Sequence, residues 1–95
     1  MSVISKPNLF AAARATKNAQ LMEKVARWYE LASRNDFENL VDLQRVFPSA
    51  DWVGERVVFN LGSYRLICGV SFLRRTFFIK ALLSHAEYDK GAWKS

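Results

Sequence analysis

The chain has 95 residues, of which 51% are hydrophobic and 24% are charged, and its net charge at pH 7 is +5. This length fills one hydrophobic core, so we expect a single domain over residues 1–95. The composition excludes a disordered chain, and no apolar run approaches the roughly 18–20 residues of a membrane span. The one cysteine, Cys68, excludes an internal disulfide and a cysteine-based zinc site, and we expect a buried strand residue in a cytoplasmic protein. The positive charge favours an anionic partner such as nucleic acid.

The N-terminal part of the sequence predicts a short strand and two helices. Residues 2–5 suit an edge strand, and Pro7 then suits the first turn of an alanine-rich helix. Asn18 can cap a second helix with its side-chain oxygen. The apolar positions of that helix recur with a period of 3.6 residues, so we expect them in the core. They are Leu21, Val25, Trp28 and Ala32.

A third helical segment follows, and its charges are mainly acidic. Asn35 is the predicted cap, and Glu38 is placed three residues later to bond back to it. The segment should end near Pro48, where residues 48–51 read as a turn.

The second half of the sequence predicts an antiparallel sheet. Gly62 and Ser63 suit a two-residue type II′ turn, and Arg74 and Arg75 lie in the next turn. Helices first and antiparallel strands last predict an α+β domain. The predicted strands, all rich in Val, Ile, Phe and Tyr, are residues 56–61, 64–72 and 76–83.

Residues 56–84 contain no Asp or Glu, so every charge on the predicted sheet is positive. Because side chains alternate along a strand, four polar residues should share the face turned away from the helices. They are Arg56, Asn60, Arg65 and Lys80. Lys80 should share its face with Leu82 and Ser84. Like charges on adjacent strands repel, so a bound anion would stabilise this face, and the alternative is a solvated surface without a ligand.

The sequence after the sheet predicts a short helix. Ser84 and Glu87 have the spacing of a capping box, in which each side chain bonds the backbone N–H of the other residue. The helix should begin at His85 and cover Trp93. We assign Glu87 to capping and not to catalysis.

His85, the one histidine, lies three residues from Tyr88 and four from Asp89, so the three should be neighbours on the helix. A helix N-terminus and nearby cations favour a neutral imidazole, which can accept a proton. Tyr88 could orient a ribose, stack on a base or donate a proton. The alternatives are that His85 only ends the strand and that Tyr88 packs with its hydroxyl outward.

Five segments carry a family pattern in the second half of the chain. The segments are Val46-Phe47-Pro48-Ser49, Val58-Phe59-Asn60-Leu61-Gly62, Tyr64-Arg65-Leu66-Ile67, Phe78-Ile79-Lys80 and Ser84-His85-Ala86-Glu87-Tyr88-Asp89-Lys90. In this order, over roughly residues 40–90, they resemble the HigB toxins of bacterial toxin–antitoxin pairs. The His-Xaa-Glu-Tyr-Asp ending is the most specific part.

The resemblance implies the RelE/ParE-like fold and an endoribonuclease (mRNA interferase) that cuts mRNA on the translating ribosome without a metal or cofactor. It implies a HigA-like antitoxin with a helix-turn-helix domain, through which the pair would bind its operator DNA. The catalytic residues would be Arg65, Lys80, His85 and Tyr88. The RNA-binding residues would be Arg56, Asn60, Arg74 and Arg75. Lys80 stands where many relatives have arginine, and lysine lacks the bidentate geometry for phosphate.

Two other functions fit the same residues. One is a non-catalytic toxin of the ParE type, which inhibits DNA gyrase on the same fold. The other is a basic RNA-binding module that is not toxic. Intact transcripts during growth arrest would favour the first, and harmless overexpression would favour the second.

Overall fold

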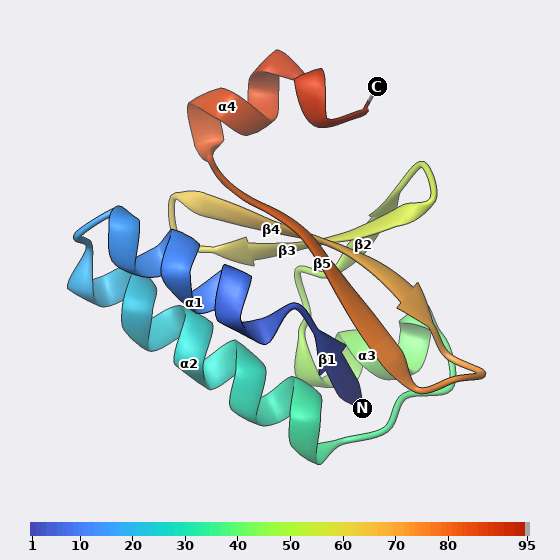
Figure 1. The fold of residues 1–95 in the computed structure, drawn as a ribbon. Helices are drawn as coiled ribbons and strands as arrows, with labels where there is room; N and C mark the ends of the chain where they lie inside the picture. The colour runs from blue at the N-terminus through green and yellow to red at the C-terminus, as the bar shows by residue number, and fades with distance from the viewer. Residues whose placement is uncertain (95) are drawn as a thin grey trace.

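The computed structural model describes residues 1–94 and shows an α+β fold, as predicted (Figure 1). Its sheet is mixed and has five strands in the order β1-β5-β4-β3-β2. The elements in chain order are β1 (Ser2–Ile4), α1 (Lys6–Ala15), α2 (Ala19–Arg34), α3 (Leu40–Val46), β2 (Asp51–Val53), β3 (Arg56–Leu61), β4 (Tyr64–Ser71), β5 (Thr76–Ser84), α4 (His85–Lys90) and the 3-10 helix η1 (Ala92–Lys94).

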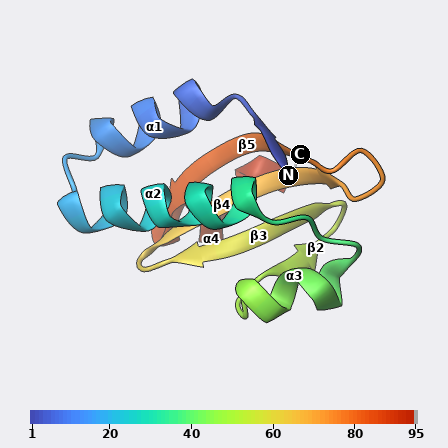
Figure 2. The same cartoon turned by 90° about the horizontal axis from the view of Figure 1, so that it is seen from below.

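The first two helices form as predicted and lie on one side of the sheet (Figure 2). Pro7 lies in the first turn of α1, where its missing N–H costs no hydrogen bond. Asn18 caps α2, because its side-chain oxygen accepts a hydrogen bond from the N–H of Leu21 at 3.1 Å. The predicted core positions of α2 are all buried, namely Leu21, Val25, Trp28 and Ala32.

The third helix begins later than predicted. Its cap is Asn39, whose side-chain oxygen accepts from the N–H of Asp42 at 2.8 Å. Asn35 ends α2 instead, where its side-chain amide donates to a carbonyl of the last turn at 2.7 Å. The N–H of Glu38 donates to the Asp42 carboxylate. The predicted pairing of Asn35 with Glu38 is therefore wrong, because both residues bond elsewhere.

Two strands extend the predicted antiparallel sheet at its edges. The N-terminal strand β1 pairs in parallel with β5, so the sheet is mixed. The predicted turn over residues 48–51 ends one residue early, because Asp51 begins β2, which pairs antiparallel with β3. A strand of three residues that starts with an acid has no alternating pattern, so the sequence did not reveal it.

A β-bulge in β5 interrupts the alternation predicted for that strand. Ile67 of β4 pairs with Ala81, and the next residue, Cys68, pairs with Ile79. Lys80 is thus the extra residue between two pairs. An extra residue bends a strand and shifts the side chains that follow it to the other face.

The shift overturns the prediction for the end of β5. Residues in a cross-strand pair share a face, so Leu83 lies on the face of its partner Arg65, away from α1 and α2. Leu82 packs against the core on the helix side. The prediction that Leu82 and Ser84 share a face with Lys80 is therefore wrong, because it assumed unbroken alternation.

The core lies between α1, α2, α3 and the sheet, and Trp28 is at its centre. The Trp28 ring contacts Phe59 and Phe77 at centroid distances of 5.4 and 5.6 Å. Cys68 is buried in β4 as predicted, and burial raises the pKa of its thiol. No helix within residues 1–94 is long and apolar enough to cross a membrane.

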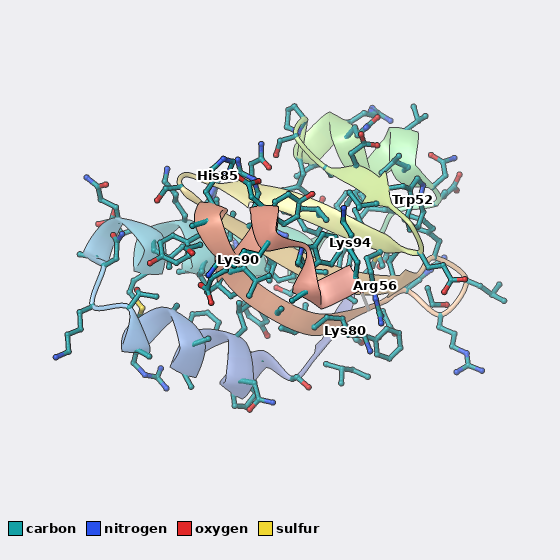
Figure 3. The ribbon with its side chains drawn as sticks, turned by 90° about the horizontal axis from the view of Figure 1, so that it is seen from above. Trp52, Arg56, Lys80, His85, Lys90 and Lys94 are labelled. Atoms are coloured by element: carbon teal, nitrogen blue, oxygen red, sulfur yellow. The ribbon has the colours of Figure 1, made fainter. Side chains whose placement is uncertain are left out.

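The C-terminal segment, residues 85–94, crosses the other face of the sheet (Figure 3). Val58 and Ile67 point to this face and are still buried, so the face is partly covered and not open. The predicted helix is shorter than expected. Gly91 adopts a left-handed conformation (φ 71°) that ends α4, and Trp93 lies in η1.

Candidate functional site

Arg56 and Lys80 converge on the face of the sheet that the C-terminal segment crosses. They meet above Gly69 of β4, where a Cβ atom would lie 3.4 Å from Nη1 of Arg56 and 3.5 Å from Cε of Lys80. The glycine therefore leaves room for both side chains. The bulge places Lys80 at this point, as Figure 3 shows together with Arg56 and Lys94.

The charges of this pair are not neutralised by the protein. Among residues 1–94, neither Arg56 nor Lys80 forms an ion pair. The Lys80 ammonium lies 5.9 Å from the ring centre of Phe78, a contact that orients the cation without removing its charge. Two adjacent cations without a carboxylate attract an anion.

Arg65 and Asn60 lie farther along the same face, at the turn between β3 and β4. They are cross-strand partners, as the sequence analysis expects for residues that share a face. The Arg65 guanidinium donates to the carbonyls of Gly62 and Tyr64 at 3.0 and 2.9 Å, so it holds the turn. Asn60 is four residues from Arg56 in β3, which corresponds to about 13 Å along a strand.

His85 lies at the same end of the sheet as Arg65. Its backbone N–H donates to the carbonyl of Ser63, which joins the start of α4 to the β3–β4 turn. Its Nε2 atom lies 3.2 Å from the carboxylate of Asp89, one helical turn later. The imidazole side chain is 59% exposed, so solvent and ligands can reach it.

The predicted capping box of α4 is present. Ser84 accepts from the N–H of Glu87 at 3.2 Å, and the Glu87 carboxylate accepts from the N–H of Ser84 at 3.1 Å. The second of these bonds lowers the pKa of the Glu87 carboxyl, because it stabilises the charged form. Within residues 1–94, no three His, Cys, Asp or Glu side chains are grouped to hold a metal ion.

Tyr88 contacts Trp93, and Trp93 in turn lies across a cleft from Arg56. The two rings stack at 5.1 Å with an interplanar angle of 18°, and the Trp93 indole N–H donates to the Tyr88 carbonyl at 3.0 Å. Trp93 and Lys94 line a cleft together with Arg56. The sequence analysis missed both residues as site candidates, because only the path of the C-terminal segment brings them to the sheet.

Arg74 and Arg75 lie in the β4–β5 turn, as predicted, away from Arg65 and His85. Arg75 pairs with Asp36 at 3.1 Å, which ties the turn to the loop before α3. Its charge is therefore partly compensated. Arg74 is exposed and forms no ion pair among residues 1–94.

The predicted site residues thus form three separate groups. Arg56 and Lys80 meet above Gly69, Asn60, Arg65 and His85 lie at the β3–β4 turn, and Tyr88 stacks on Trp93, while Arg74 and Arg75 lie apart from all three in the β4–β5 turn. Along β5, Lys80 is four residues from Ser84, the residue before His85. Four residues correspond to about 13 Å along a strand. Among residues 1–94, no hydrogen bond or ion pair joins His85 to Arg56 or Lys80.

Comparison with known proteins identifies the family. A family model described as "HigB_toxin, RelE-like toxic component of a toxin-antitoxin system" matches residues 21–91. A protein named "mRNA interferase HigB" from Escherichia coli O6:H1 (strain CFT073) is 30% identical over 95% of this chain and 90% of its own length. The chain belongs to the HigB toxin family.

Membership in the HigB toxin family bears on the face of the sheet that carries Arg56 and Lys80. A toxic component of a toxin–antitoxin system has an antitoxin as its partner. The family match covers all predicted site residues, from Arg56 to Tyr88. Trp93 and Lys94 lie beyond the matched residues 21–91. The cleft of this HigB-family toxin therefore combines matched residues, 53–56, with two unmatched ones, Trp93 and Lys94.

Proposed function

We propose that this HigB-family toxin is an endoribonuclease that cleaves mRNA. The observation that carries the proposal is the pair of Arg56 and Lys80, which converge above Gly69 on strands without any acid. Such a pair suits a phosphodiester, whose negative charge increases in the transition state. The name of the Escherichia coli relative supports the same activity.

The proposed reaction uses the RNA's own 2′-hydroxyl as nucleophile. A base removes the proton of the 2′-OH, and the 2′-oxygen forms a bond to the adjacent phosphorus. The bond from phosphorus to the 5′-oxygen breaks, and an acid protonates that oxygen. The products are a 2′,3′-cyclic phosphate and a 5′-hydroxyl. The mechanism assigns every step to side chains and to the RNA, without a metal.

Each predicted site residue has a proposed role in this reaction. Lys80, with Arg56 beside it, stabilises the charge on the phosphorane. His85, which Asp89 holds in position, transfers a proton. Tyr88 assists this transfer or orients the ribose. The more distant groups bind the RNA backbone, which sets position without reading sequence. They are Asn60, Arg65 and Arg74, whereas Arg75 acts indirectly, because its pair with Asp36 holds the β4–β5 turn that carries Arg74.

The proposed setting is the bacterial cytoplasm, where the toxin cuts mRNA on the translating ribosome. We propose a HigA-like antitoxin with a helix-turn-helix domain as the neutralising partner. In this proposal the toxin meets operator DNA only through the antitoxin. A neighbouring reading frame that encodes a small helix-turn-helix protein would support the pairing.

Growth arrest and RNA cleavage test the function together. Expression of the chain without an antitoxin should stop growth, and mapping of RNA 5′ ends should reveal new ends with 5′-hydroxyls. Lys80→Ala should lower the cleavage rate by about 10²- to 10³-fold, since it removes a group that stabilises transition-state charge. His85→Ala should also relieve the arrest.

Arg27→Ala is the matched control for charge. Arg27 is an exposed cation of α2 on the other side of the sheet, so its loss should leave toxicity unchanged. Full toxicity of both Lys80→Ala and His85→Ala would reject the proposed site. Arrest with intact transcripts and DNA damage would reject the ribonuclease and favour a gyrase inhibitor.

A further inference from the structure

A cleft separates the C-terminal segment from the β2–β3 turn. Its volume is about 490 Å³, within the range of small-ligand sites. The β2–β3 turn and the start of β3 form one wall, and the end of the C-terminal segment forms the other. The lining residues are Val53, Gly54, Glu55, Arg56, Trp93 and Lys94.

The protein holds Trp93 in place within the cleft wall. One contact is the stack on Tyr88, and a second is the hydrogen bond from the indole N–H to the Tyr88 carbonyl. The left-handed Gly91 turns the chain so that Trp93 returns over the sheet. Tyr88 covers one face of the indole, so only the opposite face is left to offer a ligand, and the exposed Lys94 ammonium lies 5.6 Å from the same ring centre. A ring fixed in advance loses little entropy on binding.

The charges at the cleft favour a ligand that carries an anion. Arg56 and Lys94 are cationic and Glu55 is anionic, so the lining is positive on balance. Lys80 adds a further cation, because it lies beside Arg56 above Gly69. The cleft thus offers the Trp93 ring at one wall and Arg56 at the other, and Lys80 lies beside Arg56 next to the cleft.

We propose that this cleft is a nucleotide subsite, in which one base of single-stranded RNA stacks on Trp93 while its phosphate binds Arg56 and Lys80. The identity of the occupant as RNA rests on the proposed function. Base stacking on aromatic side chains requires an unpaired base, so the subsite selects single strands over duplexes. Trp93 is then a substrate-positioning residue that orders the strand across Arg56 and Lys80.

Fluorescence quenching measures the stacking directly. Trp28 is buried and Trp93 is partly exposed, so in a Trp52→Phe protein Trp93 is the tryptophan that a bound base can reach and quench. A short 2′-O-methyl oligonucleotide, which lacks the nucleophilic hydroxyl, serves as the probe and cannot be cleaved by the proposed reaction. Titration of the full chain with this probe should quench the Trp93 emission. Binding without quenching would overturn the stacking.

Variants of Trp93 separate stacking from packing. Trp93→Ala should weaken binding of the probe roughly 5- to 150-fold, the usual effect of losing one base–aromatic stack. Trp93→Phe keeps a ring against Tyr88 and should restore most of the affinity. Trp52→Ala removes an exposed tryptophan of β2, whose partner Val57 faces the core, and should change affinity less than twofold.

The outcomes distinguish this subsite from the ribonuclease itself. If the wild-type chain cleaves RNA while Trp93→Ala binds the probe like the wild type, the subsite is wrong and the function stands. If the wild-type chain binds the probe through Trp93 but never cleaves RNA, the function is wrong and the subsite stands. Weak binding by both Trp93→Ala and Trp93→Phe, with unchanged thermal unfolding, would also overturn the stacking role.

Discussion

Glu87 is exposed, and its structural role comes from local hydrogen bonds alone. Its carboxylate and its backbone N–H both bond to Ser84, three residues earlier. Interactions of such short range depend on spacing in the sequence, so the capping box was predictable. Asn18 and Leu21 are a second example at the start of α2. Asn35 shows the limit of predicting caps from spacing, because its side-chain amide donates to a carbonyl of α2 instead of capping α3.

The lowered pKa of the Glu87 carboxyl predicts an acid-sensitive α4. The folded state lowers the pKa of this carboxyl, so the ionised carboxylate stabilises the folded state at pH values above the unfolded pKa of about 4.3. This stabilisation is lost as the pH falls through the lower pKa of the folded state. We expect α4 to fray as the pH falls below the unfolded pKa of this carboxyl and through its lower folded value, while the core stays folded. Amide hydrogen exchange of Ser84 measures this fraying.

The variant Glu87→Ala is the control for this titration. It should fray at neutral pH, and its protection factor, which is the exchange rate corrected for the intrinsic pH dependence, should not change with acid because the titrating group is gone. Equal pH dependence in wild type and variant would contradict the assignment.

At the scale of elements, the bulge in β5 and Gly69 in β4 act together. The bulge supplies Lys80 as an unpaired residue, and Gly69 leaves the space that Lys80 and Arg56 share. The three strand interiors were predicted from composition and alternation. The bulge was not, because it is a property of the pairing between two strands and not of either strand alone.

Gly69→Val is predicted to separate the two cations while the sheet remains folded. A Cβ at this position would already touch Arg56 and Lys80, and the branched methyl groups would displace them. Valine favours strands, so stability should fall by less than about 1 kcal/mol. RNA cleavage should fall at least about tenfold, as expected when a phosphate site is misplaced.

Gly69→Ala is the graded control for this substitution. Its single methyl group makes ordinary contacts at 3.4–3.6 Å, so most cleavage should remain. Full cleavage by the folded Gly69→Val protein would show that the convergence of Arg56 and Lys80 is not needed. Thermal unfolding and cleavage of one RNA substrate are the two measurements.

At the scale of the whole molecule, positive charge is spread over several surfaces, and only part of it faces the proposed RNA site. Arg75 is an example of a charge used within the fold, because it pairs with Asp36 across the loop before α3. Arg56 forms no ion pair among residues 1–94. Net charge therefore predicts the class of partner, while the tertiary structure decides which cations are available.

The salt dependence of RNA binding should separate these two arginines. Each phosphate contact to single-stranded RNA contributes about 0.7 to the slope of log affinity against log salt. Arg56→Ala should lower the slope by about that amount, and Arg75→Ala should leave it nearly unchanged. Titrations of the 2′-O-methyl oligonucleotide at several salt concentrations give both slopes, and equal slopes for the two variants would contradict the assignment.

The sequence by itself determined the α+β class, the buried face of α2, the strand interiors and the capping box of α4. These features depend on periodicity and on contacts within a few residues, which the order of side chains specifies. It also contained the family pattern in residues 46–90.

Only the tertiary structure decided which of the predicted site residues meet. It separated His85 and Arg65 from Lys80, brought Arg56 to Lys80 above Gly69, and returned Trp93 over the sheet. These arrangements depend on a bulge, on strand register and on a glycine that ends α4. The bulge and the strand register are set by contacts between residues far apart in the chain, which no local pattern encodes.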